Sequence, residues 1–197
     1  MRKPVDDLRK DIVFSAHLRQ HEFAFHSTWG LFSPEAIDPG SKLLIDHLDV
    51  RPNDTAIDLG CGYGAIGIAV AREASAGYVH LVDKDFIAVE YAKKNIAVNG
   101  IANATAYLSN GFNAIPKDQR FDLILSNLPA KVGRELYDIF FLDAKNFLKP
   151  GGRIYVVTIA GLKEFIKKNF HEIFGNYDKV KQNGTHVVAR AVKRSPS

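Results

Sequence analysis

The chain has 197 residues, of which 46% are hydrophobic and 24% charged, which suits one globular domain with a sizeable core. The single cysteine, Cys61, excludes an internal disulfide, and no group of cysteines and histidines has zinc spacing, so we expect no metal. Apolar runs of membrane-spanning length are absent, and the charged segment from Met1 to Lys10 lacks an apolar signal core, so we expect a cytoplasmic protein with no membrane partner. The net charge of +4 is compatible with a nucleic-acid partner and does not require one.

The first forty residues predict a small N-terminal unit. A helix is predicted over residues 4–20 and a strand over residues 21–28. These predictions rest on apolar residues at helical spacing and then on alternating ones: Val5, Leu8 and Ile12, followed by Phe23 and Phe25. A loop rich in glycine and proline completes the unit. We expect residues 1–40 to pack, as helix, strand and loop, against a catalytic domain formed by residues 41–197.

From residue 41 onward, strands and helices alternate. Ser41 is predicted to cap a helix that ends near Leu48. Strands are then predicted at 55–59, 77–83, 104–108, 121–126 and 153–159, and helices at 64–75, 86–99, 134–148 and 162–173. Two last strands, 176–182 and 185–193, are joined by Asn183-Gly184, a strong hairpin signal. This order predicts an α/β fold with a Rossmann-like, doubly wound, mostly parallel seven-stranded sheet, in which the C-terminal hairpin supplies one antiparallel strand.

The stretch from Asp58 to Gly64 reads DLGCGYG and separates the first predicted strand of this sheet from the following helix. Glycine lacks a Cβ and tolerates positive φ, so Gly60, Gly62 and Gly64 would let a ligand approach bare backbone. The Asp58 carboxylate at the strand end would repel a phosphate and accept a cationic cofactor. S-adenosylmethionine (SAM) has an ammonium, a sulfonium and no phosphate. We interpret Cys61 as a small residue that fits the turn.

The glycines also allow another interpretation. Residues 62–67 match GxGxxG, the dinucleotide fingerprint, so a turn that binds NAD and a tight turn with no ligand are both alternatives. Asp83 ends the next strand and is placed to accept both hydroxyls of a ribose, whichever cofactor binds. Lys84 follows it, and Asp85 is better explained as the N-cap of the next helix.

Asn110 and Gly111 follow the third strand of the predicted sheet. The Asn110 amide can contact an adenine edge and Phe112 can offer a ring face, although an Asn-Gly pair is also a plain turn signal. In parallel sheets, ligands bind at the carboxyl ends of the strands. We therefore predict that these residues belong to the same binding site as Asp58 and Asp83.

Asn127, Leu128 and Pro129 follow the fourth strand and are the candidate catalytic residues. The Asn127 amide oxygen can accept a hydrogen bond from a substrate N–H. Pro129 favours an extended backbone at Leu128, which could aim the Leu128 carbonyl into the pocket. Two acceptors on one amino group would orient its lone pair toward a methyl donor, and such orientation can supply about 7–11 kcal/mol. A simple Asn-X-Pro turn is the alternative.

Together these residues resemble class I SAM-dependent methyltransferases, and above all the small-domain methyltransferases of the ribosomal RNA guanine-N2 type and their short single-domain relatives. The resemblance extends from about Phe23 to Lys193. Three segments carry it: FHSTWGLFS at 25–33 is similar to the family's F-x-x-x-x-G-V-F-S, DPGS at 38–41 to D-x-G-[TS], and 58–64 to motif I. This combination favours SAM over NAD.

The resemblance implies a role for each of these sites. Asp58 and the glycines would hold the methionine part of SAM, Asp83 its ribose, and Asn110 its adenine. The expected cofactor-binding residues are Asp58, Gly60, Cys61, Gly62, Gly64, Asp83, Lys84, Asn110, Gly111 and Asn127.

The fourth strand end departs from the family pattern N-P-P-[FY]. Leu128 replaces the first proline, and Ala130 replaces an aromatic residue that stacks on the flipped base, a contact worth about 1–3 kcal/mol. Another aromatic could take over, and Trp29, Phe32 and Tyr63 are the candidates. The expected substrate-binding residues are Trp29, Phe32, Ala130 and Lys131. No dedicated general base is evident.

The expected function is methylation of an exocyclic amino group of RNA, of the guanine-N2 type, by direct displacement at the sulfonium methyl. The same chemistry on a small molecule or a protein amine is an alternative, because motif IV has changed. A SAM- or RNA-binding module with little catalysis and an NAD-dependent oxidoreductase are alternatives from other classes. Both a monomer and a homodimer fit the sequence.

Overall fold

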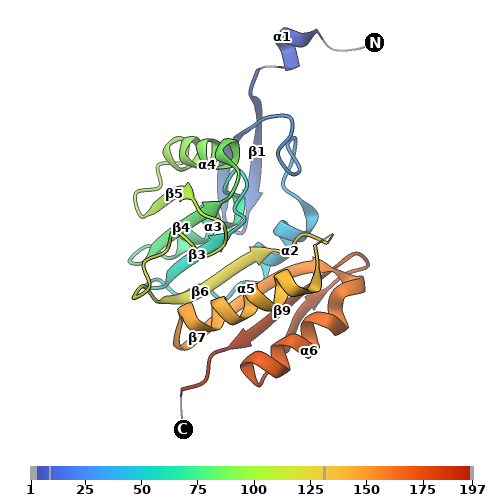
Figure 1. Cartoon of the computed structure of the whole chain (residues 1–197). Helices are drawn as coiled ribbons and strands as arrows, with labels where there is room; N and C mark the ends of the chain where they lie inside the picture. The colour runs from blue at the N-terminus through green and yellow to red at the C-terminus, as the bar shows by residue number, and fades with distance from the viewer. Residues whose placement is uncertain (1–3, 9, 131, 196–197) are drawn as a thin grey trace.

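The computed structural model describes residues 4–8, 10–130 and 132–195. Its main sheet has seven strands in the order β5-β4-β3-β6-β7-β9-β8. The first five are parallel to one another, and β9 runs antiparallel to both of its neighbours. Figure 1 shows this sheet flanked by helices, with β1 standing away from it and the two termini far apart. The predicted doubly wound sheet with one antiparallel strand is confirmed.

The elements of the core follow the predicted alternation. The strands are β3 (Thr55–Leu59), β4 (Tyr78–Asp83), β5 (Ala104–Leu108), β6 (Phe121–Asn127), β7 (Leu148–Ile159), β8 (Asp178–Gln182) and β9 (His186–Val192). The helices are α2 (Pro39–Asp46), α3 (Ala65–Glu73), α4 (Phe86–Val98), α5 (Arg134–Phe147), the 3-10 turn η1 (Ala160–Leu162) and α6 (Lys163–Phe174). None of the helices in the described ranges is long and apolar enough to cross a membrane.

Strand β7 begins earlier than predicted. We expected this strand to start at residue 153, after Pro150-Gly151-Gly152, but β7 starts at Leu148 and pairs there with Phe121. The register shifts between Phe121 and Leu123, and Gly151 has φ +79°. The glycines thus form an irregularity inside a continuous strand, because glycine at positive φ accommodates extra residues in a ladder.

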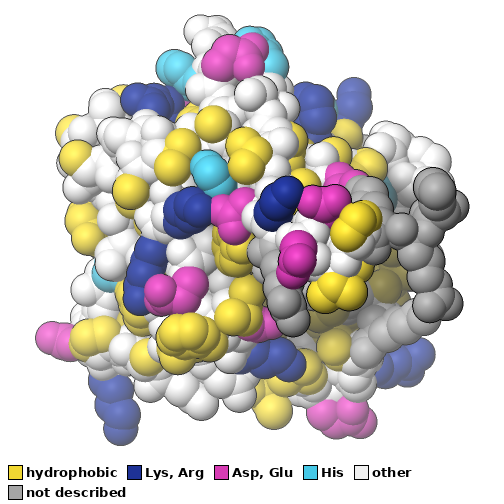
Figure 2. All heavy atoms as spheres, turned by 90° about the horizontal axis from the view of Figure 1, so that it is seen from above, with side chains coloured by type: hydrophobic (Ala, Val, Ile, Leu, Met, Phe, Trp, Pro, Cys, Tyr) yellow, Lys and Arg dark blue, Asp and Glu magenta, His cyan; other side chains and the backbone are white. Residues whose placement is uncertain are grey.

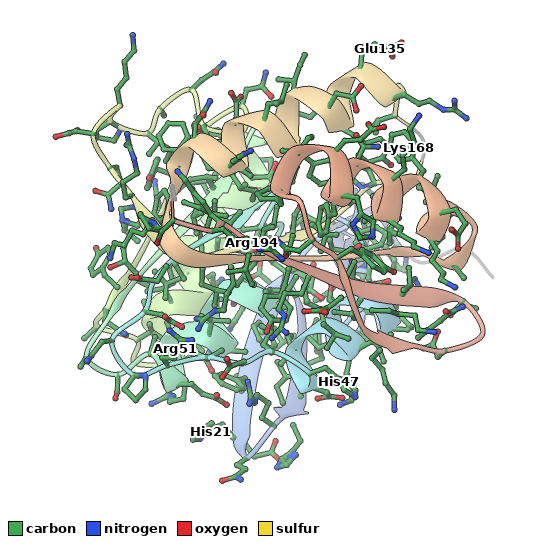
Figure 3. The ribbon with its side chains drawn as sticks, turned by 90° about the horizontal axis from the view of Figure 1, so that it is seen from below. His21, His47, Arg51, Glu135, Lys168 and Arg194 are labelled. Carbon is green, nitrogen blue, oxygen red and sulfur yellow. The ribbon has the colours of Figure 1, made fainter. Side chains whose placement is uncertain are left out.

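Alternating residues of the strands form a core on each face of the sheet. One core contains Ala56, Leu81 and Leu123 and packs against α2, α3 and α4. The other contains Ile57, Val82 and Ile124 and packs against α5 and α6. Figure 3 shows α5 and α6 side by side, with Glu135 at the start of α5 and Lys168 on α6, and the N-terminal hairpin on the other side of the sheet. This two-sided burial explains the nearly continuous apolar runs of the strands.

The N-terminal unit differs from the prediction. Its helix, α1, covers only Val5–Leu8, and the rest of the predicted helix forms β1 (Ile12–Leu18), which pairs antiparallel with β2 (His21–Ser27). The prediction of a helix over 4–20 is therefore wrong beyond α1. Apolar residues in this segment also alternate with period two, and Phe14 packs 5.7 Å from the Phe25 ring and 5.9 Å from the Tyr63 ring. Tertiary packing selected the strand period.

Asn95 of α4 and Asn99, the C-cap of that helix, form hydrogen bonds to the outer edge of β2. The Asn95 side chain accepts from the His26 backbone nitrogen (2.7 Å) and donates to the His26 carbonyl (2.8 Å) and to the Tyr63 carbonyl (2.9 Å). One helical turn on, Asn99 accepts from the Ala24 nitrogen (3.0 Å) and donates to the Ala24 carbonyl (2.8 Å). These amides replace a neighbouring strand and satisfy edge groups of β2.

Candidate active site at the carboxyl ends of the strands

The glycine turn after β3 is fixed by hydrogen bonds to β4 and borders open space on its other side. The backbone nitrogens of Gly60 and Cys61 both donate to the Val82 carbonyl of β4, at 2.9 and 3.0 Å. Gly60 and Gly62 have φ of +73° and +55°, and a Cβ built on either would meet no atom within 4 Å. The backbone of this turn therefore borders open space, which a ligand can approach closely.

Asp58 lies under the turn with one carboxylate oxygen unsatisfied. Its side chain is fully buried, and Oδ2 accepts from the Gly67 backbone nitrogen at 2.8 Å. Oδ1 has no hydrogen-bond partner among the described residues. Burial, with a smaller effect from the Asp83 charge, raises the pKa of Asp58 to about 7. A buried carboxylate is unfavourable without a donor or a counter-charge, so the site suits a ligand that brings a cationic donor.

Asp83 and Asp85 divide two tasks at the end of β4. Asp83 Oδ2 accepts from the Gly62 nitrogen at 2.9 Å and Oδ1 from the Asp85 nitrogen at 3.0 Å, which fixes its orientation beside the glycine turn. Each carboxylate oxygen keeps acceptor capacity for a ligand hydroxyl. Asp85 accepts from the Ile87 nitrogen at 2.7 Å and is the N-cap of α4, as predicted.

A cavity of about 380 Å³ lies between Lys84, which follows Asp83, and the loop after β5. Its lining residues are Lys84, Leu108, Ser109, Asn110, Asn113 and Ala114. The Ser109 hydroxyl donates to the Gly111 carbonyl (2.7 Å) and accepts from the Ala114 nitrogen (3.1 Å), so the loop is held by its own bonds. The exposed Asn110 lines this cavity, and its contact with an adenine edge stays a prediction.

The suggested ring contact from Phe112 is not supported by its position. Phe112 is buried and stacks on Phe147, with ring centroids 4.6 Å apart and ring planes 6° from parallel. Its faces therefore serve the core between α5 and the loop after β5.

Asn127, the last residue of β6, has its amide held in one orientation. Its Nδ2 donates to Asp38 Oδ2 at 2.8 Å and to Ser41 Oγ at 2.9 Å. Because a carboxylate only accepts hydrogen bonds, the NH2 end of the amide is turned to Asp38 and the oxygen is left for another donor. The amide oxygen is thus available as an acceptor at the carboxyl end of β6, and its contact with a substrate N–H stays a prediction.

The backbone after Asn127 leaves the ladder. The Leu128 nitrogen still donates to the Val157 carbonyl at 2.9 Å, while no described residue donates to the Leu128 carbonyl. The Leu128 side chain is buried, and the Tyr137 hydroxyl donates to the Pro129 carbonyl. These contacts fix the segment from both sides, and within the described part of the chain the Leu128 carbonyl, next to Asn127, is left without a donor.

The residues expected at the substrate have different environments. Phe32 and Trp29 are 69% and 40% exposed on the loop after β2, and Ala130 is exposed. Tyr63 is buried, and its hydroxyl donates to the Ala36 carbonyl at 3.2 Å, so its ring is not available to a substrate. Lys131 lies outside the described residues.

The sequence prediction missed the functions of the segment before α2. We expected Ser41 to cap this helix, but Asp38 is the N-cap and accepts from the Ser41 nitrogen at 2.8 Å, while Pro39 starts the helix. Glycine is needed at position 40, because a Cβ there would lie 2.8 Å from Cδ2 of His186 and 3.0 Å from Asp38 Oδ2. The D-x-G-[TS] motif was the available signal, but its contact with Asn127 spans 89 residues.

A larger cavity, of about 560 Å³, lies at the other end of the sheet. It is lined by Arg19, Gln20, His21, Asp46 and Glu73, around the turn between β1 and β2. Figure 3 shows His21 at the free end of that hairpin. Arg19 and Glu73 form an ion pair of 2.7 Å there. Since α3 runs from the glycine turn to Glu73, this cavity is a helix length away from Asp58, and we assign no part of the active site to it.

The order of the seven-stranded sheet and the open glycine turn after β3 are those of a Rossmann-like methyltransferase of class I. The family described as Methyltransferase small domain matches residues 22–190, and the chain belongs to this family. The predictions of a SAM-dependent methyltransferase and of SAM as its cofactor are thereby confirmed over the NAD alternative.

Individual relatives agree with this assignment. The uncharacterized protein YbxB of Bacillus subtilis is 32% identical over 184 residues, which cover 92% of this chain and 91% of YbxB. Ribosomal RNA large subunit methyltransferase G of Shewanella amazonensis is 31% identical over 88% of this chain. The solved T. thermophilus 16S rRNA N2 G1207 methyltransferase (RsmC), in complex with AdoMet and guanosine, has a TM-score of 0.84 at 32% identity over 92% of this chain.

These relatives differ in length. The chain spans 46% of the Shewanella enzyme and 50% of the Thermus chain, so about half the length of each. It spans nearly all of YbxB. Similarity to the two rRNA enzymes is thus similarity to one part of each of them.

Proposed function

We propose that this chain transfers a methyl group from SAM to the exocyclic amino group of a guanine in ribosomal RNA. The observation that carries the proposal is the acceptor pair formed by the Asn127 amide oxygen and the Leu128 carbonyl. Two relatives support the choice of substrate, because their names record rRNA methylation and one of them was solved with guanosine.

The cofactor would be held by groups already in place. Asp58 Oδ1 would accept from the ammonium of the methionine part, and the bare backbone of Gly60 and Gly62 would leave room for its chain. Asp83 would accept from the ribose hydroxyls, and Asn110 with Lys84 would border the adenine. Cys61 would contribute its small volume, since its buried thiol donates only to the Gly62 carbonyl at 3.5 Å and burial raises its pKa. When bound, SAM supplies an electrophilic methyl group on a sulfonium.

The acceptor pair would orient the nucleophile. Asn127 Oδ1 and the Leu128 carbonyl would each accept one N–H of the substrate amino group, so that its nitrogen lone pair points at the methyl group. Attack forms the N–C bond as the C–S bond breaks, and the nitrogen then loses one proton to water. Pro129 would keep the Leu128 backbone extended during this step. Such a mechanism depends on position rather than on a side chain that removes a proton.

The base would be held by aromatic residues from another segment. Ala130 cannot stack, whereas Phe32 and Trp29 present exposed rings on the loop after β2. Stacking on such a ring is worth about 1–3 kcal/mol per base. Figure 2 shows that on the face seen from above, charges of both signs are intermixed among hydrophobic side chains. With a net charge of only +4, recognition would rest on stacking and hydrogen bonds more than on a single basic field.

Transfer of labelled methyl groups tests the proposal. The purified chain is incubated with labelled SAM and with ribosomal subunits or total RNA from a strain lacking its gene, beside protein and metabolite fractions. The expected result is label in rRNA that digests to N2-methylguanosine. Label in protein or metabolites alone would overturn the RNA substrate, and would mean that Leu128 and Ala130 accompany a change of substrate. SAM binding with no transfer to any fraction would identify a binding module instead.

A further inference from the structure

Asp38 lies where it can determine the role of Asn127. It is buried between the start of α2 and the end of β6, and one oxygen, Oδ2, accepts both from the Ser41 nitrogen and from Asn127 Nδ2, each at 2.8 Å. Ser41 Oγ accepts the second amide proton at 2.9 Å. Both protons of the Asn127 NH2 group are therefore engaged inside the protein.

These two partners are not equivalent. A hydroxyl can donate or accept, so Ser41 alone would tolerate either orientation of the amide. A carboxylate can only accept, so Asp38 excludes the orientation in which the amide oxygen faces inward. Reversal of the amide would place two acceptors in contact in a buried setting, at a cost of about 1–3 kcal/mol or more.

The position of Asp38 is itself held from several sides. It caps α2 through the Ser41 nitrogen, and Gly40 leaves space for the His186 ring of β9 beside it. The carboxylate is thus fixed by the start of α2 and lies between Asn127 at the end of β6 and His186 of β9. This rigidity orients Asn127, whose amide cannot reverse without losing its bond to Asp38.

We propose that Asp38 is a positioning residue that makes Asn127 an obligate hydrogen-bond acceptor, so that the site selects a substrate group bearing N–H rather than a carbonyl or an unprotonated ring nitrogen. Ser41 supports it by engaging the second amide proton. The consequence for the substrate rests on the function proposed above, whereas the orientation of the amide is a property of the protein alone.

The substitution Asp38→Ser separates this role from helix capping. Serine is as good an N-cap as aspartate, so α2 keeps its cap, but its shorter side chain no longer reaches Asn127. Asp38→Asn is the conservative variant, because its amide oxygen can still accept both bonds. Asp85→Ser is the matched control, since Asp85 caps α4 in the same way and does not contact Asn127.

Two readouts are compared across these variants. In the first, NMR follows hydrogen exchange of the Asn127 side-chain NH2 pair, which Asn127→Ala identifies by its disappearance. We expect slow exchange in the wild type, Asp38→Asn and Asp85→Ser, and fast exchange in Asp38→Ser. In the second, the single-turnover methylation rate falls about 10- to 100-fold in Asp38→Ser, with SAM affinity unchanged, and is largely restored in Asp38→Asn.

Each readout can overturn the proposal by itself. Protected Asn127 protons in Asp38→Ser would mean that Asp38 does not hold the amide. Fast exchange together with a wild-type rate would mean that the orientation does not matter for transfer. If the wild type methylates no RNA, the function proposed above fails, while the exchange measurement still decides whether Asp38 fixes the amide.

Discussion

The two halves of the proposed active site, one for the cofactor and one for the substrate amino group, are built in different ways. The cofactor half is made mainly of backbone, in which the turn around Gly60 and Gly62 is tied to β4 and two carboxylates are fixed by backbone N–H groups. The acceptor half depends on side chains from distant segments, since Asn127 is held by Asp38 and Ser41 from the start of α2. A local motif can therefore specify the first half, whereas the second exists only once the tertiary structure has formed.

The largest expected effect comes from a substitution in the acceptor half, which should reduce methylation and leave SAM binding largely intact. In Asn127→Ala the amide oxygen that orients the nucleophile is lost, so the methylation rate should fall about 100- to 1,000-fold. SAM affinity should change far less, because Asp58, Asp83 and the glycine turn remain. Single-turnover kinetics and calorimetric titration with SAM measure the two quantities. An equal loss of both would show that the two halves are one unit.

The substitution Asp58→Asn tests the cofactor half, because it should weaken SAM binding and leave the acceptor pair unchanged. The variant keeps the shape and the bond from the Gly67 nitrogen but loses the charge, so SAM affinity should fall about 10- to 100-fold, as for one charge-assisted hydrogen bond. The free energy of unfolding without SAM should not fall, because the wild-type charge is buried without a counter-charge. Titration with SAM and urea denaturation test this pair of results. A destabilised variant would argue against an uncompensated charge in the wild type.

Phe32→Ala tests the substrate side without touching the acceptor pair. We expect kcat/KM for RNA to fall by an amount equivalent to about 1–3 kcal/mol, because the stacking contact is lost. The Tm should not change, because the ring is exposed. Leu136→Ala on α5 is the matched control, since Leu136 is also an exposed apolar residue. Equal activity of both variants and the wild type would remove Phe32 from the substrate site.

A smaller effect, the dependence of SAM affinity on pH, tests the charge of Asp58 in the cofactor half. The pKa of Asp58 is raised from 3.8 to about 7, so its neutral form stabilises the folded state in full below about pH 4, and this contribution is lost as the pH rises to 7. Binding of an ammonium requires the charged form, so SAM affinity should rise up to about tenfold per pH unit below pH 7 and then level off. In Asp58→Asn this dependence should disappear. A flat wild-type profile would place the pKa of Asp58 well below 7.

The sequence was sufficient wherever neighbours in the chain determine the structure. The turn from Asp58 to Gly64, the Asp85 cap and the Asn183-Gly184 hairpin were all predicted, because each is specified by a few adjacent residues. It was insufficient for β1, where apolar residues fit both periods and packing against Phe25 and Tyr63 selected the strand.

The same reason explains what was missed in the candidate site. The sequence predicts Ser41 rather than Asp38 as the cap of α2, and nothing near Asp38 in the chain indicates its bond to Asn127. Phe112 and Tyr63 were offered as ring contacts because exposure cannot be read from their neighbours, and both proved to be buried.

The amide contacts of α4 with β2 have a consequence for the growing chain. The bond between the His26 nitrogen and Asn95 joins residues 69 positions apart, so the hairpin is made long before its partner helix. At about 5–20 residues per second, the outer edge of β2 remains unpaired for about 3–14 s of synthesis. During that interval the nascent hairpin exposes a free strand edge, where another extended chain could pair. The arrival of Asn95 and Asn99 closes it.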